Sequence, residues 1–225
     1  MKLVLFDIDG TLLTTDGAGR AALRAAAADV FGVHEDLQCI SISGRTDVSI
    51  IRDILAAHDL PADDRNVNRY IGGYLTRLHD KLKSYPGGVL PGIRPLLAAL
   101  AELPCRVGLL TGNLQRGAQM KLEYHGLWGR FPFGAFADDS PDRNDLGPIA
   151  RKRAAGLFNE EFPAHETYII GDTPRDIACA RAAAARAVAV ATGHFTLEQL
   201  AVDKPDYLFP NLTDTDKVLA ELALR

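Results

Sequence analysis

The stretch LVLFDIDGTLL, residues 3–13, decides the fold, because two aspartates follow directly after a run of apolar residues. Four consecutive apolar side chains at 3–6 are typical of a strand buried on both faces of a sheet. Asp7 and Asp9 lie two positions apart, which on an extended chain points both carboxylates to the same side. Because burying a carboxylate without a partner is strongly unfavourable, a cation, a set of hydrogen-bond donors or a reaction must account for the pair.

The composition indicates an ordinary globular protein that acts on small molecules. The chain has 225 residues, 47% of them hydrophobic and 24% charged, enough for one full core and an added subdomain. A formal charge of -4 offers no basic surface, so neither nucleic acid nor an anionic membrane is an expected partner. The N-terminal apolar run is too short for a secretion signal, and none approaches the roughly 18 residues of a membrane span. We therefore expect a cytoplasmic protein, monomeric or homodimeric.

Three cysteines, Cys39, Cys105 and Cys179, lie far apart in the chain. Their odd number and wide spacing fit neither a disulfide framework nor a zinc site. We expect three buried, reduced thiols.

Further short apolar runs predict a parallel sheet. A strand-helix alternation favours an α/β fold with a Rossmann-like, doubly wound parallel sheet. The runs lie at 107–110, 167–170, 187–191 and 207–209, and segments with helical periodicity lie at 91–103, 116–127 and 176–187.

Residues 15–85 interrupt this alternation. They contain three segments with helical periodicity, at 18–32, 46–60 and 67–82, and no strong strand. Because a loop of this length is improbable inside a compact domain, we expect an inserted α-helical cap at 15–85 on a catalytic core formed by 1–14 and 86–225.

The polar residues directly after the strands predict the site, since the carboxyl ends of parallel strands meet at one edge of the sheet. Up to four carboxylates would surround one point there, and Mg²⁺ with oxygen ligands commonly relieves such crowding. Beside this cation, hydroxyl and amide donors suit a phosphate group, which one carboxylate could attack while a second carries a proton. The carboxylates are Asp7, Asp9, Asp172 and Asp176, and the donors are Thr111, Gly112 and Asn113.

Simpler interpretations stay open at several of these positions. TGN at 111–113 is ordinary turn composition, and Asp172 or Asp176 could merely cap a helix. In GRTD at 44–47, a helix start capped by Thr46 and an anion contact by Arg45 are about equally favoured.

Three motifs together resemble those of the haloacid dehalogenase-like hydrolase superfamily. They are DIDGT at 7–11, the strand ending in TGN at 111–113, and IGDTPRD at 170–176. The resemblance spans nearly the whole chain and extends to phosphoglycolate phosphatase-like members with a helical cap. It implies a Rossmann-like core, Mg²⁺ as the cofactor and an aspartyl-phosphate intermediate.

The resemblance also implies a role for each matching residue. Asp7 would be the nucleophile, and Asp9 the general acid and base that also binds the metal through its backbone carbonyl. The Thr111 hydroxyl would contact the phosphate, while Asp172 and Asp176 would form the metal side of the site.

Two positions depart from the superfamily pattern. The third motif usually supplies a lysine, often in a Lys-Pro setting, and no Lys-Pro occurs at 137–154. Arg143 is expected to replace this lysine, because its planar guanidinium supplies a positive charge and can donate two hydrogen bonds at once. Lys152 is the alternative. Where similar proteins often close a helix with glycine, this chain has Ala184, which costs about 1 kcal/mol if the position is left-handed.

These features predict a Mg²⁺-dependent phosphatase for a small phosphorylated metabolite, with the cap selecting the substrate. A phosphomutase with the same motifs stays open, as does a phosphate-binding or regulatory module without turnover. The intact pair of Asp7 and Asp9 argues against the module. A haloacid dehalogenase is disfavoured because it has no need of Asp9, and a phosphonatase because GRTD offers an arginine in place of a cap lysine.

Overall fold

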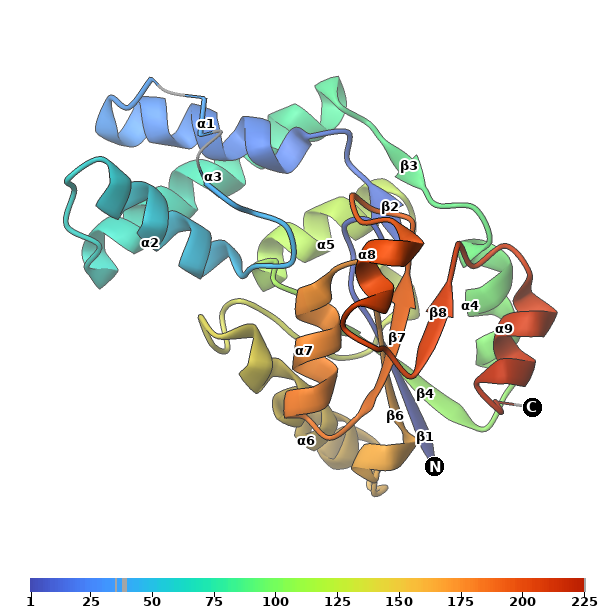
Figure 1. Cartoon of the computed structure of the whole chain (residues 1–225). Coiled ribbons are helices and arrows are strands. Elements are labelled where there is room, and N and C mark those ends of the chain that lie inside the picture. Colours follow the sequence, from blue (N-terminus) through green and yellow to red (C-terminus); the bar gives the residue numbers. More distant parts are fainter. Residues whose placement is uncertain (35, 38–39, 225) are drawn as a thin grey trace.

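The computed structural model of the chain describes residues 1–34, 36–37 and 40–224. Within them, six parallel strands form a central sheet in the order β5-β4-β1-β6-β7-β8 (Figure 1). The chain winds outward from β1 to one edge and then returns to build the other half, so the predicted α/β class with a doubly wound, Rossmann-like sheet is confirmed. The strands are β1 (Lys2–Phe6), β4 (Cys105–Leu110), β5 (Gly134–Ala135), β6 (Thr167–Gly171), β7 (Arg186–Val190) and β8 (Tyr207–Phe209).

Two apolar layers cover the sheet, one on each face. In β1, Val4 and Phe6 pack into one layer while Leu3 and Leu5 pack into the other, as strand alternation requires. Helices α4, α5 and α9 cover the first face, and α6, α7 and α8 cover the second. Their bounds are α4 (Ile93–Ala101), α5 (Gln115–Tyr124), α6 (Leu146–Phe158), α7 (Pro174–Ala182), α8 (Leu197–Ala201) and α9 (Thr215–Glu221), with short 3-10 helices η1 (Trp128–Arg130), η2 (Arg143–Asp145) and η3 (Ala164–Glu166).

A helical unit lies beside the carboxyl ends of the strands (Figure 1). Its helices α1 (Ala18–Phe31), α2 (Asp47–Ala57) and α3 (Asp64–Ser84) pack around a separate apolar core. The chain enters and leaves the unit through β2 (Leu13–Thr14) and β3 (Gly88–Val89), which pair antiparallel. The division into 15–85 and the rest of the chain stays a prediction. No helix among the described residues is both long and apolar enough to cross a membrane.

Local differences from the expected elements have simple causes. The sequence pattern does not predict β2, β3 or β5, because a strand of two residues carries no periodicity. The helix expected at 176–187 ends earlier, at Ala182, and the chain then turns through Ala184. A φ of 52° confirms that Ala184 is left-handed.

The variant Ala184→Gly should raise the free energy of unfolding by about 1 kcal/mol, because glycine adopts this conformation without the clash of a Cβ. Ala184 is exposed, so no packing is lost. Urea unfolding measures the change. Ala178→Gly, at an exposed position inside α7, is the matched control and should lower stability by about 0.5–1 kcal/mol. A loss of stability in both variants would show that position 184 is not strained.

The cysteines that the structure describes behave as expected. Cys105 and Cys179 are buried free thiols, and burial raises the pKa of each. Cys39 lies outside the described residues.

Candidate active site

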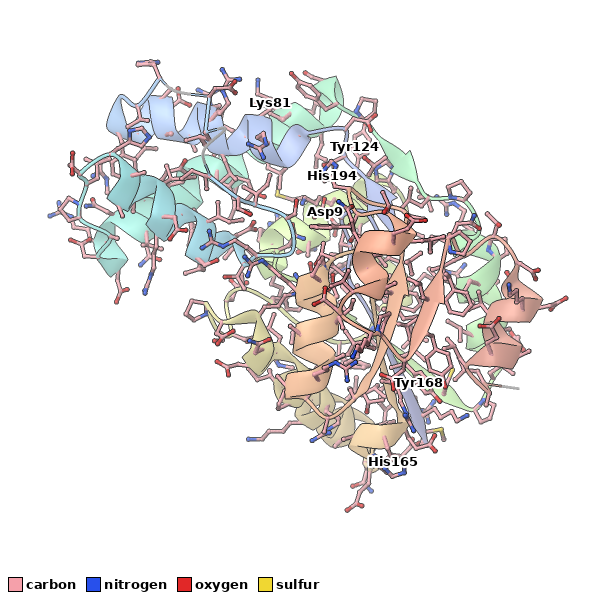
Figure 2. All side chains as sticks on the ribbon, viewed as in Figure 1. Asp9, Lys81, Tyr124, His165, Tyr168 and His194 are labelled. Atoms are coloured by element: carbon pink, nitrogen blue, oxygen red, sulfur yellow. The ribbon has the colours of Figure 1, made fainter. Side chains whose placement is uncertain are left out.

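One cavity of about 790 Å³ lies between the sheet and the helical unit. It collects the residues that follow β1, β4, β6 and β7, and all the predicted site residues except Asp176 line it. The helical unit contributes Arg20, Arg45 and Tyr74 to the opposite wall. Figure 2 shows Asp9 and His194 where the helical unit meets the sheet, while His165 and Tyr168 lie at the other end of the strands.

Three buried aspartates, Asp7, Asp172 and Asp176, form an aspartate cluster. One carboxylate oxygen of each lies within 4.8 Å of the others. Arg143 Nη2 lies 3.3 Å from Asp7 Oδ1 and donates a hydrogen bond to Asp176 Oδ1. Among the described residues Arg143 is the only cation in ion-pair contact with the cluster, so negative charge remains in excess.

Two glycines make room for Asp172. A Cβ on Gly10, whose φ is 83°, would lie 2.4 Å from Asp172 Oδ2, and a Cβ on Gly193 would lie 1.7 Å from the same atom. Thr11 Oγ1 donates to Asp172 Oδ1 at 3.1 Å. Within the described part of the chain no donor contacts Oδ2, which leaves this oxygen available to a ligand.

The electrostatics of the aspartate cluster fit a divalent cation. Burial, reinforced by the carboxylates of Asp176 and Asp7, raises the pKa of Asp172 to about 8. Burial also raises the pKa of Asp7 to about 6, against the opposing effect of Arg143. Both shifts arise mainly from burial, with neighbouring carboxylates adding to them, and a hard cation with oxygen ligands would neutralise this buried negative charge.

Mg²⁺ should bind more tightly as the pH rises from 6 to 8, because it displaces protons from Asp7 and Asp172, whose pKa values are raised to about 6 and about 8. The dissociation constant should fall by up to about tenfold per pH unit for each proton released. In the metal-free protein the folded state holds these protons more tightly than the unfolded chain, so the free energy of unfolding should fall as the pH rises through the same range.

Isothermal titration calorimetry in two buffers with different ionisation enthalpies measures both the affinity and the protons released. Asp172→Asn should remove most of the binding and the part of the pH dependence that the Asp172 proton contributes. An affinity for Mg²⁺ that is unchanged between pH 6 and pH 8 would exclude Asp7 and Asp172 as ligands with these pKa values.

Asp176 is held mainly by protein donors. Its Oδ2 accepts hydrogen bonds from the N–H and Oγ1 of Thr173 at 3.0 and 2.7 Å, and its Oδ1 accepts from Arg143. Asp176 is thus the third helical residue of a capping box whose N-cap is Thr173, and a role in metal binding stays a prediction.

Arg143 contacts two members of the aspartate cluster, Asp7 and Asp176, and its role as the cation that replaces the usual lysine stays a prediction. Burial opposes its charge, but Asp176 and Asp7 outweigh burial and raise the pKa of the guanidinium. Its Nη1 donates to the carbonyl of Gly44 at 3.2 Å, so the same side chain also contacts the helical unit. Lys152, the alternative, is exposed on α6 and lies outside both the ion pairs of the cluster and the cavity lining in the described structure.

The Asp9 carboxylate does not join the cluster. Its Oδ2 accepts hydrogen bonds from Lys121 Nζ at 2.6 Å and from Asn113 Nδ2 at 2.8 Å. Because β1 ends at Phe6, strand alternation does not hold Asp9 on the side of Asp7. Three of the up to four expected carboxylates therefore form the aspartate cluster, and the Asp9 carboxylate lies outside it. A metal contact through the backbone carbonyl of Asp9 stays a prediction.

Lys121 is a site residue that the sequence reasoning missed. It lies on α5, almost fully buried, and its Nζ donates to both Asp9 and Asn113. One signal could have revealed it: Ala118 and Leu122, three residues before and one after, lie on the buried face of the same helix. A lysine on such a face requires an acidic partner nearby.

The TGN segment connects the sheet to the helical unit. Thr111 is buried, and its Oγ1 accepts hydrogen bonds from the backbone N–H and Nδ2 of Asn113 at 3.3 and 2.9 Å. The carbonyl of Gly112 accepts from the N–H of Asp47 at 2.7 Å. These contacts include the internal bonds of a turn, and substrate binding by all three residues stays a prediction.

Arg45 lines the cavity but is paired within the helical unit. Its Nη1 lies 2.5 Å from Asp53 Oδ2. The neighbouring Thr46 accepts a hydrogen bond from the N–H of Ser49 at 3.2 Å, which confirms the predicted cap at the start of α2. An anion contact by Arg45 stays a prediction.

The sequence from 4 to 190 matches the family model described as haloacid dehalogenase-like hydrolase, which covers the aspartate cluster, Arg143 and Lys121. The chain belongs to this family. The resemblance seen in the three motifs, and the enzyme class that it implies, are thereby confirmed.

This haloacid dehalogenase-like hydrolase is similar over its length to several proteins. It is 28% identical to the probable phosphatase IndB of Dickeya dadantii, over 94% of this chain and 90% of the relative. It is 26% identical to a phosphoglycolate phosphatase of Synechococcus elongatus, over 99% of each chain. The crystal structure of a hydrolase from Pseudomonas syringae has the same fold, with a TM-score of 0.77 at 20% identity over 98% of this chain and 99% of that one.

Proposed function

We propose that this hydrolase is a Mg²⁺-dependent phosphatase that releases phosphate from a small phosphorylated metabolite through an aspartyl-phosphate on Asp7. The observation that carries the proposal is the aspartate cluster with a single arginine, beside a cavity large enough for a metabolite. Relatives named as phosphatases, one of them a phosphoglycolate phosphatase, support the reaction class.

Mg²⁺ would be held by Asp7, Asp172 and the backbone carbonyl of Asp9, with Asp176 beside them, and would neutralise the charge of the cluster and of the phosphate oxygens. Asp7 attacks the phosphorus, and the bond between phosphorus and the substrate oxygen breaks. Asp9 gives a proton to that leaving oxygen. Water then attacks the phosphorus and gives its proton to Asp9, so that Asp7 and inorganic phosphate are released.

The remaining residues orient and enclose the reacting groups. Arg143 holds Asp7 in position through the ion pair at 3.3 Å, and Thr111 and Asn113 offer donors to the phosphate. The unit at 15–85 acts as a cap that selects the alcohol. Its contacts with the core support this role: Arg143 donates to the carbonyl of Gly44, and Thr46 Oγ1 donates to the carbonyl of Pro141 at 2.7 Å.

A screen of phosphate release tests the proposal. The purified protein is given para-nitrophenyl phosphate and a panel of metabolites that includes phosphoglycolate and sugar phosphates, with Mg²⁺ or with EDTA. Release that requires Mg²⁺ is expected, and activity confined to phosphoglycolate would define the substrate. Isomerisation of a sugar phosphate without release would favour a phosphomutase, and no reaction with any compound would favour a phosphate-binding module.

A further inference from the structure

We infer that Lys121 is a positioning residue for Asp9 and that Asp9 exchanges its proton with the substrate through Oδ1. The inference rests on the proposed function, because it assigns an oxygen and a supporting residue to the proton transfer proposed for Asp9. Lys121 lies outside the three motifs, so nothing in the motif pattern accounts for its burial.

Lys121, Asp9 and Asn113 form a closed triangle of hydrogen bonds. Lys121 Nζ donates to Asp9 Oδ2 at 2.6 Å and to Asn113 Oδ1 at 2.5 Å, while Asn113 Nδ2 donates to the same Asp9 Oδ2 at 2.8 Å. Lys121 is 3% exposed, so water does not weaken its contacts. The triangle fixes one oxygen of Asp9 and therefore the direction of the whole carboxyl group.

The second oxygen of Asp9 is left for the reaction. No donor among the residues that the structure describes contacts Oδ1. The Asp9 side chain is 40% exposed and lines the cavity, and Figure 2 shows it where the helical unit faces the sheet. A carboxyl group held through Oδ2 thus presents Oδ1 to a leaving group in the cavity.

The charge of Lys121 also favours the transfer. As the bond between phosphorus and oxygen breaks, the proton moves from Oδ1 to the leaving oxygen, and negative charge develops on Asp9. The ammonium at 2.6 Å stabilises this charge, and among the described residues Lys121 forms no ion pair with the aspartate cluster. In the second half of the reaction, water returns the proton to Oδ1.

Lys121 has a second acidic neighbour, so a structural role must be separated from a positioning role. Asp47, at the start of α2, is buried, and Lys121 opposes the rise in its pKa to about 6 that burial causes. Asp47 has its own donor, the N–H of Leu114 at 2.8 Å. Loss of a purely structural lysine would affect all substrates alike, whereas loss of a residue that acts through Asp9 would depend on how strongly the leaving group needs a proton.

The experiment compares two substrates in Lys121→Met. Para-nitrophenolate leaves without a proton, whereas the alkoxide of phosphoglycolate, or of the most active alkyl phosphate in the panel, requires one. We expect kcat for the alkyl phosphate to fall by roughly 10²-fold or more and kcat for para-nitrophenyl phosphate to fall less than about threefold, with KM little changed. Lys217→Met, at an exposed position on α9, should leave both rates unchanged.

Two further variants complete the test. Adding Lys121→Met to Asp9→Asn should cause no additional loss on the alkyl phosphate, since the two residues act as one unit. Lys121→Gln removes the charge but keeps N–H donors, and it replaces Lys121→Met in the test if the methionine variant does not fold. Equal losses on both substrates, additive losses in the double variant, or unfolding of both Lys121 variants would overturn the inference. Absence of any hydrolysis by the unchanged protein would instead overturn the proposed function.

Discussion

Asp7→Asn should abolish phosphate release, with kcat at least roughly 10³-fold lower, while the protein stays folded. The amide cannot form the aspartyl-phosphate. Burial raises the pKa of Asp7 to about 6, so at pH values above this the variant also removes a buried charge that destabilises the metal-free fold. We therefore expect a melting temperature at pH 8 that is equal to or higher than that of the unchanged protein.

Phosphate release and thermal unfolding are measured on the same preparation. Asp80→Asn, at an exposed position on α3, is the matched control and should keep full activity. Activity retained by Asp7→Asn would rule out Asp7 as the nucleophile, even if the other members of the cluster proved essential.

Arg143→Met should lower the free energy of unfolding at pH 8 by about 3–5 kcal/mol, because it leaves the buried carboxylates of the cluster without a protein cation. The loss should be smaller at pH 6, since the raised pKa values of Asp7 and Asp172, about 6 and about 8, let these groups hold protons there. Saturating Mg²⁺ should recover part of the lost stability. Urea unfolding at the two pH values, with and without Mg²⁺, measures these effects.

Arg143→Lys keeps the charge but loses the planar guanidinium. Its free energy of unfolding should lie between those of Arg143→Met and the unchanged protein. Lys152→Met should change stability by less than about 0.5 kcal/mol, as is usual for an exposed position. If Arg143→Met were as stable as the unchanged protein at pH 8, the cluster would not carry the excess negative charge on which the metal site depends.

The parallel sheet could be predicted because its strands are buried on both faces. The apolar run at 3–6 becomes β1, and its side chains alternate between two apolar layers. The polar residues after β1, β4 and β6 converge for the geometric reason that parallel strands end at the same edge. Arg143 could be singled out from the sequence because its guanidinium can replace the missing lysine of the third motif, although it lies on a short 3-10 helix without periodicity.

Other parts of the site could not be predicted, because they depend on tertiary contacts. The Asp9 carboxylate points to Lys121 and not to Asp7. This direction depends on how α5, which carries Lys121, packs against the helical unit, and the sequence does not specify that packing. Arg45 pairs with Asp53, eight residues further along the same chain segment, and this reduces the charge it can offer to an anion. The sequence pattern shows which polar residues follow each strand, whereas the contacts of each side chain are set by tertiary packing.

The most direct test of the proposed mechanism is to find the phosphoryl group on the protein during turnover. The protein is mixed with Mg²⁺ and its best substrate, quenched in acid within a single turnover and digested, and the peptides are analysed by mass spectrometry. The expected result is one phosphoryl group on the peptide that contains Asp7, and none on that peptide in Asp7→Asn. A phosphoryl group on a different residue, or a burst of released alcohol with no phosphorylated peptide, would contradict an aspartyl-phosphate on Asp7.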